Sequence, residues 1–486
     1  MIRQHSAAIK FVCLVLSILM YSQATAQNNI DLPNMGDPSG AIISPEEERK
    51  IGEAIMRSVR SALRLVDDPE IVEYINALGY RLVPYSGNPQ LSFTFFVIGD
   101  DNINAFAAPG GYVAVNAGLI MATESESELA SVLAHEIAHV TQRHLARSFE
   151  TFDKLNIPYI AAMIAGILIS TQNPAAGRAA LAATQAGVAQ TQINFTRSNE
   201  AEADNIGIKA LAEAGFEPRA MPVFFGRMAR ATRYYGNRLP EFLSTHPVTT
   251  SRIAGSQARA ESYPYKQVVD SLDYYLIRMK LRVLGSEQPQ QLSRLLSENL
   301  KQGKYRRQDA TRYGLASAYL KSERAEKARS HVALLLQKDP ERLAYKILQA
   351  RLETVAGNIR KADHIYADAL KLYPNSHAII THYATMLLRS GQPNKAGKLL
   401  EEHVRYFTKD PETYRLLAMA RGDSGQKAKA HVAQAEYYYL GGHTDAAIRQ
   451  LNLARGYKDM NFYDATRIDA RLSELEAESR LVKNSK

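Results

Sequence analysis

The pattern of hydrophobic and polar positions in the first half of the chain predicts helices around two short strands. Residues 45–66 and 69–82 carry apolar side chains at helical spacing, and a serine, a proline and three glutamates mark the first helix N-terminus. Residues 91–98 and 111–116 have the apolar and alternating character of strands, and helical patterns dominate the remainder. This half is therefore predicted to be α+β, mainly helical, with a small sheet.

The second half of the chain repeats a pattern every 34 residues. A lysine–alanine pair recurs in four successive repeats, and a glycine precedes the alanine by five residues in three of them. The pairs are Lys327-Ala328, Lys361-Ala362, Lys395-Ala396 and Lys429-Ala430, and the glycines are Gly357, Gly391 and Gly425, with Glu323 in the place of the missing one. This period, with small residues where paired helices cross, is typical of tetratricopeptide repeats and predicts an all-α solenoid.

A chain of 486 residues is expected to form two folded units. The predicted organisation is a leader at 1–26, a first domain at 27–265, and a helical linker with the solenoid at 266–486. The helices before residue 310 are out of register with the repeats, so we expect them to form a cap that joins the two domains.

The first 26 residues have the pattern of a secretory signal peptide. A positively charged start is followed by an apolar run and by Ala24-Thr25-Ala26, which predicts cleavage before Gln27. The alternative, an uncleaved anchor, is disfavoured because the apolar run is only about 10 residues long. Cys13 is the only cysteine and lies in this run. A metal site in the mature chain must therefore use histidine and carboxylate ligands.

Without this leader the chain has 57 basic and 50 acidic residues. A mixed solvated surface explains this small excess, and no basic run interleaved with aromatic residues indicates nucleic-acid binding. The apolar segment 158–170 is too short to span a bilayer. We expect it, with a second helix at 175–193, to fold over the first domain; a flap that faces a membrane surface or a substrate is the alternative.

The chemistry centres on a His-Glu-x-x-His sequence within residues 125–147, a stretch predicted to be one helix. His135 and His139 are four residues apart, so both imidazoles project from one helix face toward one point. Two neutral imidazoles suit zinc, and Glu136 lies where a carboxylate can take a proton from a water that the metal activates. His144 would lie about 140° off that face of a continuous helix and is expected at the surface or in support of a ligand.

A third zinc ligand is expected from a second helix, which begins near residue 197. Glu200 and Asp204 are four residues apart and share a face, whereas Glu202 points nearly the opposite way. Glu200 can therefore bind the metal while Asp204 supports a histidine ligand. A solvated acidic helix is the alternative that the residues alone leave open.

These motifs, together with Ser-Thr-His-Pro-Val-Thr-Thr-Ser-Arg at 244–252, resemble those of the gluzincin peptidases related to the CAAX prenyl protease. With the leader and the repeats, the whole chain resembles the β-barrel assembly-enhancing proteases of Gram-negative bacteria. The resemblance implies one Zn²⁺ per chain, bound by His135, His139 and Glu200, with Glu136 as the base and Asp204 as a supporting partner.

The resemblance also implies roles for three further segments. The stretch from Asn104 to Val113, with Gly110, Gly111, Tyr112 and Val113, resembles a substrate-binding edge strand, and an unpaired edge can bind a peptide as an added strand. His246 would lie close to the zinc, either as a latch in the fourth metal position or as a donor to the oxyanion; a structural loop histidine is the third alternative. Arg252 would point to the substrate carbonyl.

The function implied by the resemblance is periplasmic quality control of outer-membrane β-barrel proteins. Such a protein would degrade stalled or unfolded barrel proteins, assist their assembly, and contact the barrel-assembly machinery through its repeats. A chaperone or scaffold with a latent or structural metal site is the competing class of function. The base Glu136 favours an enzyme, because a structural site needs no base.

Overall fold

A computed structural model describes residues 44–148, 197–235, 242–457 and 460–484, together with a few residues between 161 and 169. The predicted leader at 1–26 and the predicted helix at 175–193 lie outside the described residues. The described residues of the apolar segment 158–170 are helical, and Ile164 and Ile169 among them are buried. Among the helices that the structure describes, none has both the length and the apolar character needed to cross a membrane.

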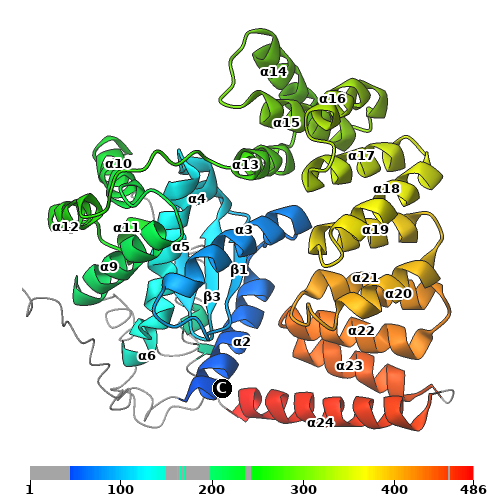
Figure 1. The fold of residues 1–486 in the computed structure, drawn as a ribbon. Coiled ribbons are helices and arrows are strands. Elements are labelled where there is room, and N and C mark those ends of the chain that lie inside the picture. Colours follow the sequence, from blue (N-terminus) through cyan, green and yellow to red (C-terminus); the bar gives the residue numbers. More distant parts are fainter. Residues whose placement is uncertain are drawn as a thin grey trace, which may run out of the picture. The chain divides into compact units, whose positions relative to one another are not determined.

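The first half is α+β, as predicted. Its elements are α2 (Pro45–Ala62), α3 (Pro69–Leu82), the 3-10 turn η2 (Val83–Tyr85), β1 (Thr94–Ile98), β2 (Ala105–Ala108), β3 (Tyr112–Asn116), α4 (Ala117–Ala122), α5 (Glu126–Thr141), α6 (His144–Ser148), α9 (Arg197–Glu213), α10 (Ala220–Tyr235), α11 (Phe242–Thr245) and α12 (Thr250–Glu261) (Figure 1). The strands form one sheet in the order β1-β3-β2, with β1 parallel and β2 antiparallel to β3. The hydrophobic pattern did not predict β2, which lies within the stretch from Asn104 to Val113 that the family resemblance implies as an edge strand.

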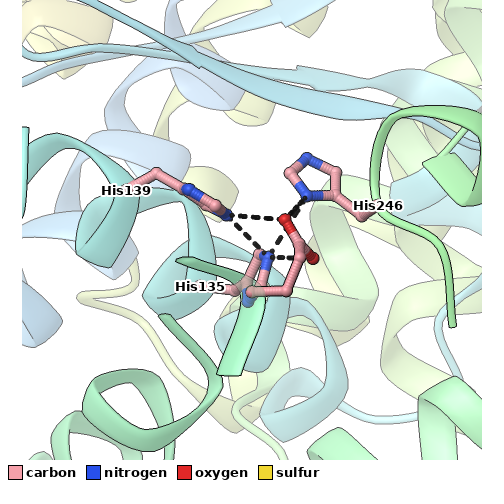
Figure 2. Close-up of side chains that lie close together, drawn as sticks. His135, His139 and His246 are labelled. Carbon is pink, nitrogen blue, oxygen red and sulfur yellow. Dashed lines mark hydrogen bonds and ion pairs between the residues drawn. The ribbon is translucent and has the colours of Figure 1, made fainter. Parts of the chain in front are cut away.

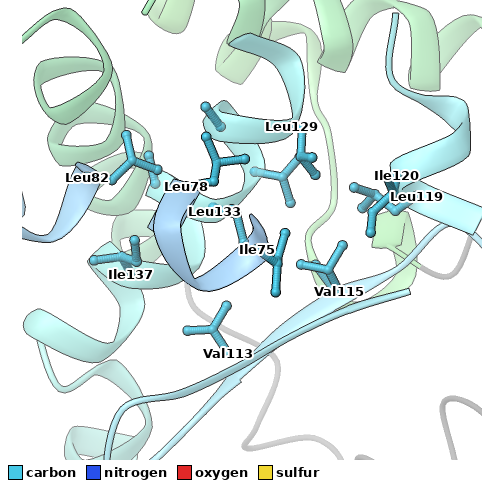
Figure 3. Close-up of a cluster of buried hydrophobic side chains, with 14 of the residues drawn as sticks. Ile75, Leu78, Leu82, Val113, Val115, Leu119, Ile120, Leu129, Leu133 and Ile137 are labelled. Atoms are coloured by element: carbon cyan, nitrogen blue, oxygen red, sulfur yellow. The ribbon is translucent and has the colours of Figure 1, made fainter. Parts of the chain in front are cut away.

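The core of this half lies between the sheet and helices α3, α4 and α5. Figure 3 shows apolar side chains of α3, α4 and α5 gathered against β3. They include Ile75, Leu78 and Leu82 of α3, Val113 and Val115 of β3, Leu119 and Ile120 of α4, and Leu129, Leu133 and Ile137 of α5. Helix α5 is buried along almost its whole length. Because it lies inside the protein, any polar group on it must find its partners within the fold.

The predicted helix at 125–147 is wrong in its continuity, because it breaks after Thr141. Helix α5 ends at Thr141, and Arg143 adopts a left-handed backbone conformation with φ of 52° before α6 begins at His144. A residue in this region ends a helix, because its backbone no longer follows the helical path. The chain therefore turns between His139 and His144 instead of continuing along one axis.

The second half is a helical solenoid, as predicted. Its helices are α13 (Leu272–Gly285), α14 (Pro289–Lys301), α15 (Gln308–Lys321), α16 (Ala325–Lys338), α17 (Leu343–Val355), α18 (Ile359–Leu372), α19 (His377–Arg389), α20 (Pro393–His403), α21 (Pro411–Asp423), α22 (Lys427–Leu440), α23 (Thr444–Arg455) and α24 (Phe462–Asn484). The second helices of four successive pairs, α16, α18, α20 and α22, begin 34 residues apart. Ala328, Ala362 and Ala396 are completely buried where these helices cross their neighbours.

The described residues from Pro45 onward pack as one compact unit, and the predicted boundary near residue 265 stays a prediction. Within this unit, helix α3 contacts the solenoid through its acidic side chains. Glu70 accepts a hydrogen bond from the Tyr313 hydroxyl at 2.8 Å and forms an ion pair with the buried Lys280. Glu73 accepts a hydrogen bond from the backbone N–H of Ala378, near the start of α19, at 2.8 Å.

The backbone at Glu323 generates a prediction about stability. Gly357 has φ of 79°, and Glu323 has φ of 59° at the equivalent position one repeat earlier. A side chain in this region costs about 1–2 kcal/mol. Gly357→Ala is therefore expected to lower the free energy of unfolding by about 1 kcal/mol, while Glu323→Gly leaves it unchanged or raises it by up to about 1 kcal/mol. Urea denaturation of the full chain measures both values; equal losses in the two variants would contradict the prediction.

Candidate metal centre

Helix α5 holds the His-Glu-x-x-His residues inside the first domain. The helix begins at the Ser125 cap, whose side chain accepts a hydrogen bond from the N–H of Glu128. His135 and Glu136 are completely buried, and His139 is 3% exposed. Such burial is unusual for two imidazoles and a carboxylate unless they bind one another or a metal. The two rings lie on one side of α5, as their spacing predicts.

Helix α9 brings the two predicted acids to the same place. Glu200 and Asp204 are both buried on the side of α9 that packs on α5. The approach is close at Gly207, where an added Cβ would lie 3.3 Å from the backbone nitrogen of His135. The absence of a side chain at Gly207 thus allows α9 to come near enough for Glu200 to reach the histidines.

Four side chains converge on one point (Figure 2). The Nε2 atoms of His135 and His139 are 3.0 Å apart, and Oε1 of Glu200 lies 3.4 Å from Nε2 of His139. Nδ1 of His246 lies 3.0 Å from the same Glu200 oxygen and 3.3 Å from Nε2 of His135. One candidate ligand atom of each residue lies within 4.8 Å of the others.

This arrangement fits a zinc ion. Ligand atoms at about 2.0–2.1 Å in a tetrahedral site are separated from one another by about 3.3 Å. The Nε2 atoms of His135 and His139 are 3.0 Å apart, and the nearest nitrogens of His135, His139 and His246 lie 3.0 to 3.5 Å from an oxygen of Glu200. Imidazole and carboxylate together suit a zinc site, as the lack of cysteine outside the predicted leader requires.

The pKa values of the two glutamates in the cluster are shifted in opposite directions. Burial alone would raise the pKa of Glu200, but the imidazoles of His246, His135 and His139 hold it well below its usual range. Burial raises the pKa of Glu136, and the neighbouring imidazoles only partly offset this effect. Within the described part of the chain neither carboxylate oxygen of Glu136 has a hydrogen-bond partner, and the ion-pair contact recorded for it is with Nε2 of His246, at 3.4 Å.

Asp204 lies behind the ligand cluster, and Arg252 joins it. Oδ1 of Asp204 is 3.0 Å from Nδ1 of His135, at ion-pair distance. The Arg252 guanidinium donates to both oxygens of Asp204, at 2.9 and 2.8 Å, and lies 2.5 Å from Oε2 of Glu200. These contacts differ from the substrate-directed orientation that the family resemblance implies for Arg252.

His246 lies just after the short helix α11, in the non-helical connection between α11 and α12. Its backbone N–H donates to the carbonyl of Phe242 at 2.8 Å, and its ring packs on the Phe242 ring with centroids 5.1 Å apart. The imidazole is 1% exposed and is the fourth member of the cluster. The structure thus brings together all of His135, Glu136, His139, Glu200, Asp204, His246 and Arg252.

His144 is not a surface residue. It is completely buried, and its Nδ1 lies 2.8 Å from Nδ1 of His139. Its Nε2 lies 3.0 Å from Oε2 of Glu202, an acid that the helical spacing placed on nearly the opposite side of α9 from Glu200. The expectation of a residue that supports a ligand agrees with this geometry. The rotation argument was wrong, because α5 does not continue to residue 144.

The predicted edge strand is wrong in part. Tyr112 and Val113 lie in β3, which is the central strand of the sheet, so neither can offer a free edge. The edge strand is β2, and Gly110 and Gly111 form the turn that follows it, with φ of 75° and 82°. Two glycines between short apolar runs are a hairpin signal that could have revealed β2 from the sequence.

Two family profiles match separate parts of the chain. The profile of peptidase family M48 matches residues 70–260, and the profile of the coatomer epsilon subunit matches residues 316–438. Mitochondrial metalloendopeptidase OMA1 of Schizosaccharomyces pombe is 33% identical over 37% of this chain and 50% of that protein.

Similarity over nearly the full length identifies the family. The beta-barrel assembly-enhancing protease of Escherichia coli O157:H7 is 36% identical over 95% of this chain and 94% of that protein. The protein of the same name from Yersinia pestis is 34% identical over 91% of each chain. The chain therefore belongs to the beta-barrel assembly-enhancing proteases, with a metallopeptidase domain of family M48 followed by a tetratricopeptide-like solenoid.

Proposed function

We propose that this protein is a periplasmic zinc-dependent endopeptidase that degrades misassembled outer-membrane β-barrel proteins and promotes barrel assembly. The observation that carries the metal assignment is the convergence of imidazole nitrogens and one carboxylate within hydrogen-bonding distance in a buried site. His135, His139 and Glu200 would hold one Zn²⁺ per chain. The ion would supply an activated water and polarise the scissile carbonyl.

Glu136 is the general base of this proposal. It follows His135 on α5, so its carboxylate lies beside the ligands without being one of them. Burial raises its pKa, and a raised pKa makes the carboxylate a stronger base for the proton that it takes from water and passes to the leaving amine. Arg252 acts indirectly in this scheme, because its contacts with Asp204 and Glu200 hold both acids in place.

His246 is proposed to be a latch. Its Nδ1 faces the ligand atoms of His135 and Glu200, and its Nε2 faces Glu136. In this position one ring contacts both the metal ligands and the base, so it obstructs the place where substrate and water must meet. A donor to the oxyanion is less well supported, because such a donor points toward the substrate and leaves the metal position open.

The substrate is proposed to add to the sheet along β2. This strand lies at the sheet edge and contacts α5. A small cavity of about 30 Å³ has Ala107, Ala108, Gly110 and His139 among its lining residues. An extended peptide on this edge would pass close to the metal ligands. Unfolded chains can adopt such an extended conformation and folded proteins rarely can, which favours stalled barrel proteins as substrates.

The solenoid is proposed to dock protein partners, among them the barrel-assembly machinery. A groove of about 1160 Å³ lies among α20, α21, α22, α23 and α24, with both basic and acidic side chains along it. Concave solenoid surfaces of this kind bind proteins. A chaperone or scaffold with a latent metal site is the second candidate function, and His246 within the ligand cluster is the observation that favours it.

The first prediction concerns metal content. Replacing His135, His139 or Glu200 with alanine is expected to reduce bound zinc from one equivalent to well below one, because each removal leaves too few ligands. Elemental analysis of the purified full chain measures this ratio. Glu213→Ala is the control, because it changes an exposed acid on α9, the helix that carries Glu200. Normal zinc content in Glu200→Ala would disprove the ligand assignment.

The second prediction separates the enzyme from the scaffold. Glu136→Gln keeps the shape of the side chain but removes the base, so degradation of an unfolded protein such as casein should fall about 10²- to 10⁴-fold. Zinc content should stay at the wild-type value. Full proteolysis by this variant would contradict the assignment. Assembly of barrel proteins in cells that carry only this variant then measures how much of the function needs catalysis.

The third prediction tests the latch. His246→Ala should increase casein degradation and self-cleavage; a latch that is closed in about nine molecules of ten would produce about a tenfold rise. The double variant Glu136→Gln, His246→Ala is the control, because it shows whether the cleavage arises at this centre. Lost activity with zinc retained would instead assign His246 to transition-state stabilisation.

A further inference from the structure

The turn after α5 places a second histidine against the metal ligand His139. Arg143 adopts φ of 52°, and a non-glycine residue in this region costs about 1–2 kcal/mol. Its Nε donates to Oε1 of Glu48 at 3.0 Å, which helps to hold the turn. The consequence of the turn is the position of His144, which folds back on the ring of His139 with centroids 4.8 Å apart and planes 75° apart.

The hydrogen bonds of this pair allow only one arrangement of protons when His139 binds a metal. Nε2 of His139 faces His135 and Glu200, so a proton on His139 must be on Nδ1. That N–H can donate only if Nδ1 of His144, at 2.8 Å, accepts. The proton of His144 is then on Nε2, from which it is donated to Oε2 of Glu202 at 3.0 Å.

The chain of contacts ends at the protein surface. The Glu202 side chain is 40% exposed and also accepts a hydrogen bond from Arg147 of α6 at 3.2 Å. His144 itself has no exposed surface. These hydrogen bonds therefore connect His139 to the surface through a completely buried imidazole that lies between a metal ligand and a carboxylate.

We infer that His144 and Glu202 form a relay that fixes the ring and the tautomer of His139 and so sets the metal affinity of the site. The relay rests on the proposed zinc function. It is the counterpart, for the second histidine ligand, of the Asp204–Arg252 pair behind His135. Partners of this kind orient a ligand and raise its basicity, and their loss costs about 10- to 100-fold in metal affinity or activity.

Zinc binding to the full chain, freed of metal with a chelator, tests the relay. Competition with a coloured chelator measures the affinity, and the visible absorption of the Co²⁺-substituted protein reports the ligand geometry. His144→Leu and His144→Asn have nearly the same shape, but only asparagine can accept the hydrogen bond from His139. Glu202→Ala removes the end of the relay, and Glu213→Ala is the matched control, with a similar exposure of 43% and an ion pair to Lys209.

The relay predicts that His144→Leu binds zinc about 10- to 100-fold more weakly, that Glu202→Ala loses about tenfold, and that His144→Asn stays within about threefold of wild type. The Co²⁺ spectrum should change in His144→Leu and not in Glu213→Ala. Wild-type affinity in both His144→Leu and Glu202→Ala would overturn the relay and leave the metal centre intact, as would an asparagine variant as weak as the leucine variant.

Misfolding of His144→Leu and a lack of zinc binding by the wild-type chain are two further possible results, and each leads to a definite conclusion. If circular dichroism shows that His144→Leu does not fold, Glu202→Ala decides the question, because it changes a half-exposed side chain. If the wild-type chain binds no zinc, the proposed metal centre fails, and the relay fails with it. That result is distinct from normal wild-type binding with unaffected variants, which contradicts the relay alone.

Discussion

The close packing of helix α9 on helix α5 is the contact on which the metal centre depends. Gly207 lies against the backbone of His135, and Ala203 is completely buried beside it. Glu200 and Asp204 lie on the same helix face, seven and three residues before Gly207. The distance between α9 and α5 at Gly207 therefore also sets how far both acids lie from the histidines. A site of this kind tolerates displacements of only about 0.5 Å. The small residues of α9 are therefore as necessary to the chemistry as the ligands themselves.

Burial of charge is the second constraint. Glu200 and Asp204 are buried acids whose pKa values are held down by imidazoles and, for Asp204, by the Arg252 guanidinium. A buried carboxylate is costly unless it is paired, so removing Arg252 or one histidine would leave a partner uncompensated. Glu136 has no such pairing among the described residues other than its contact with His246. The cluster is thus arranged to accept a cation, and the one acid that is least compensated is the one proposed to move a proton.

The residues around the centre differ in how far the sequence could predict them. His135, Glu136, His139, Glu200 and Asp204 were predicted, because they lie within regular helices whose periodicity determines the face of each side chain. The same argument failed for His144, which lies after a left-handed residue that ends α5. It placed Glu202 away from Glu200 but could not show that His144 and α6 lie against that side of α9. Periodicity says nothing about what packs against the far side of a helix.

The sequence by itself determined the architecture of this protein and the ligand types of its centre. A 34-residue period requires a helical repeat, a His-Glu-x-x-His helix presents two imidazoles together, and the single cysteine excludes a thiolate site outside the predicted leader. The tertiary structure decided which strand is the sheet edge, that His246 enters the ligand cluster, and that Arg252 contacts acids. These features depend on contacts between segments far apart in the chain, and such contacts leave no local pattern in hydrophobicity or spacing.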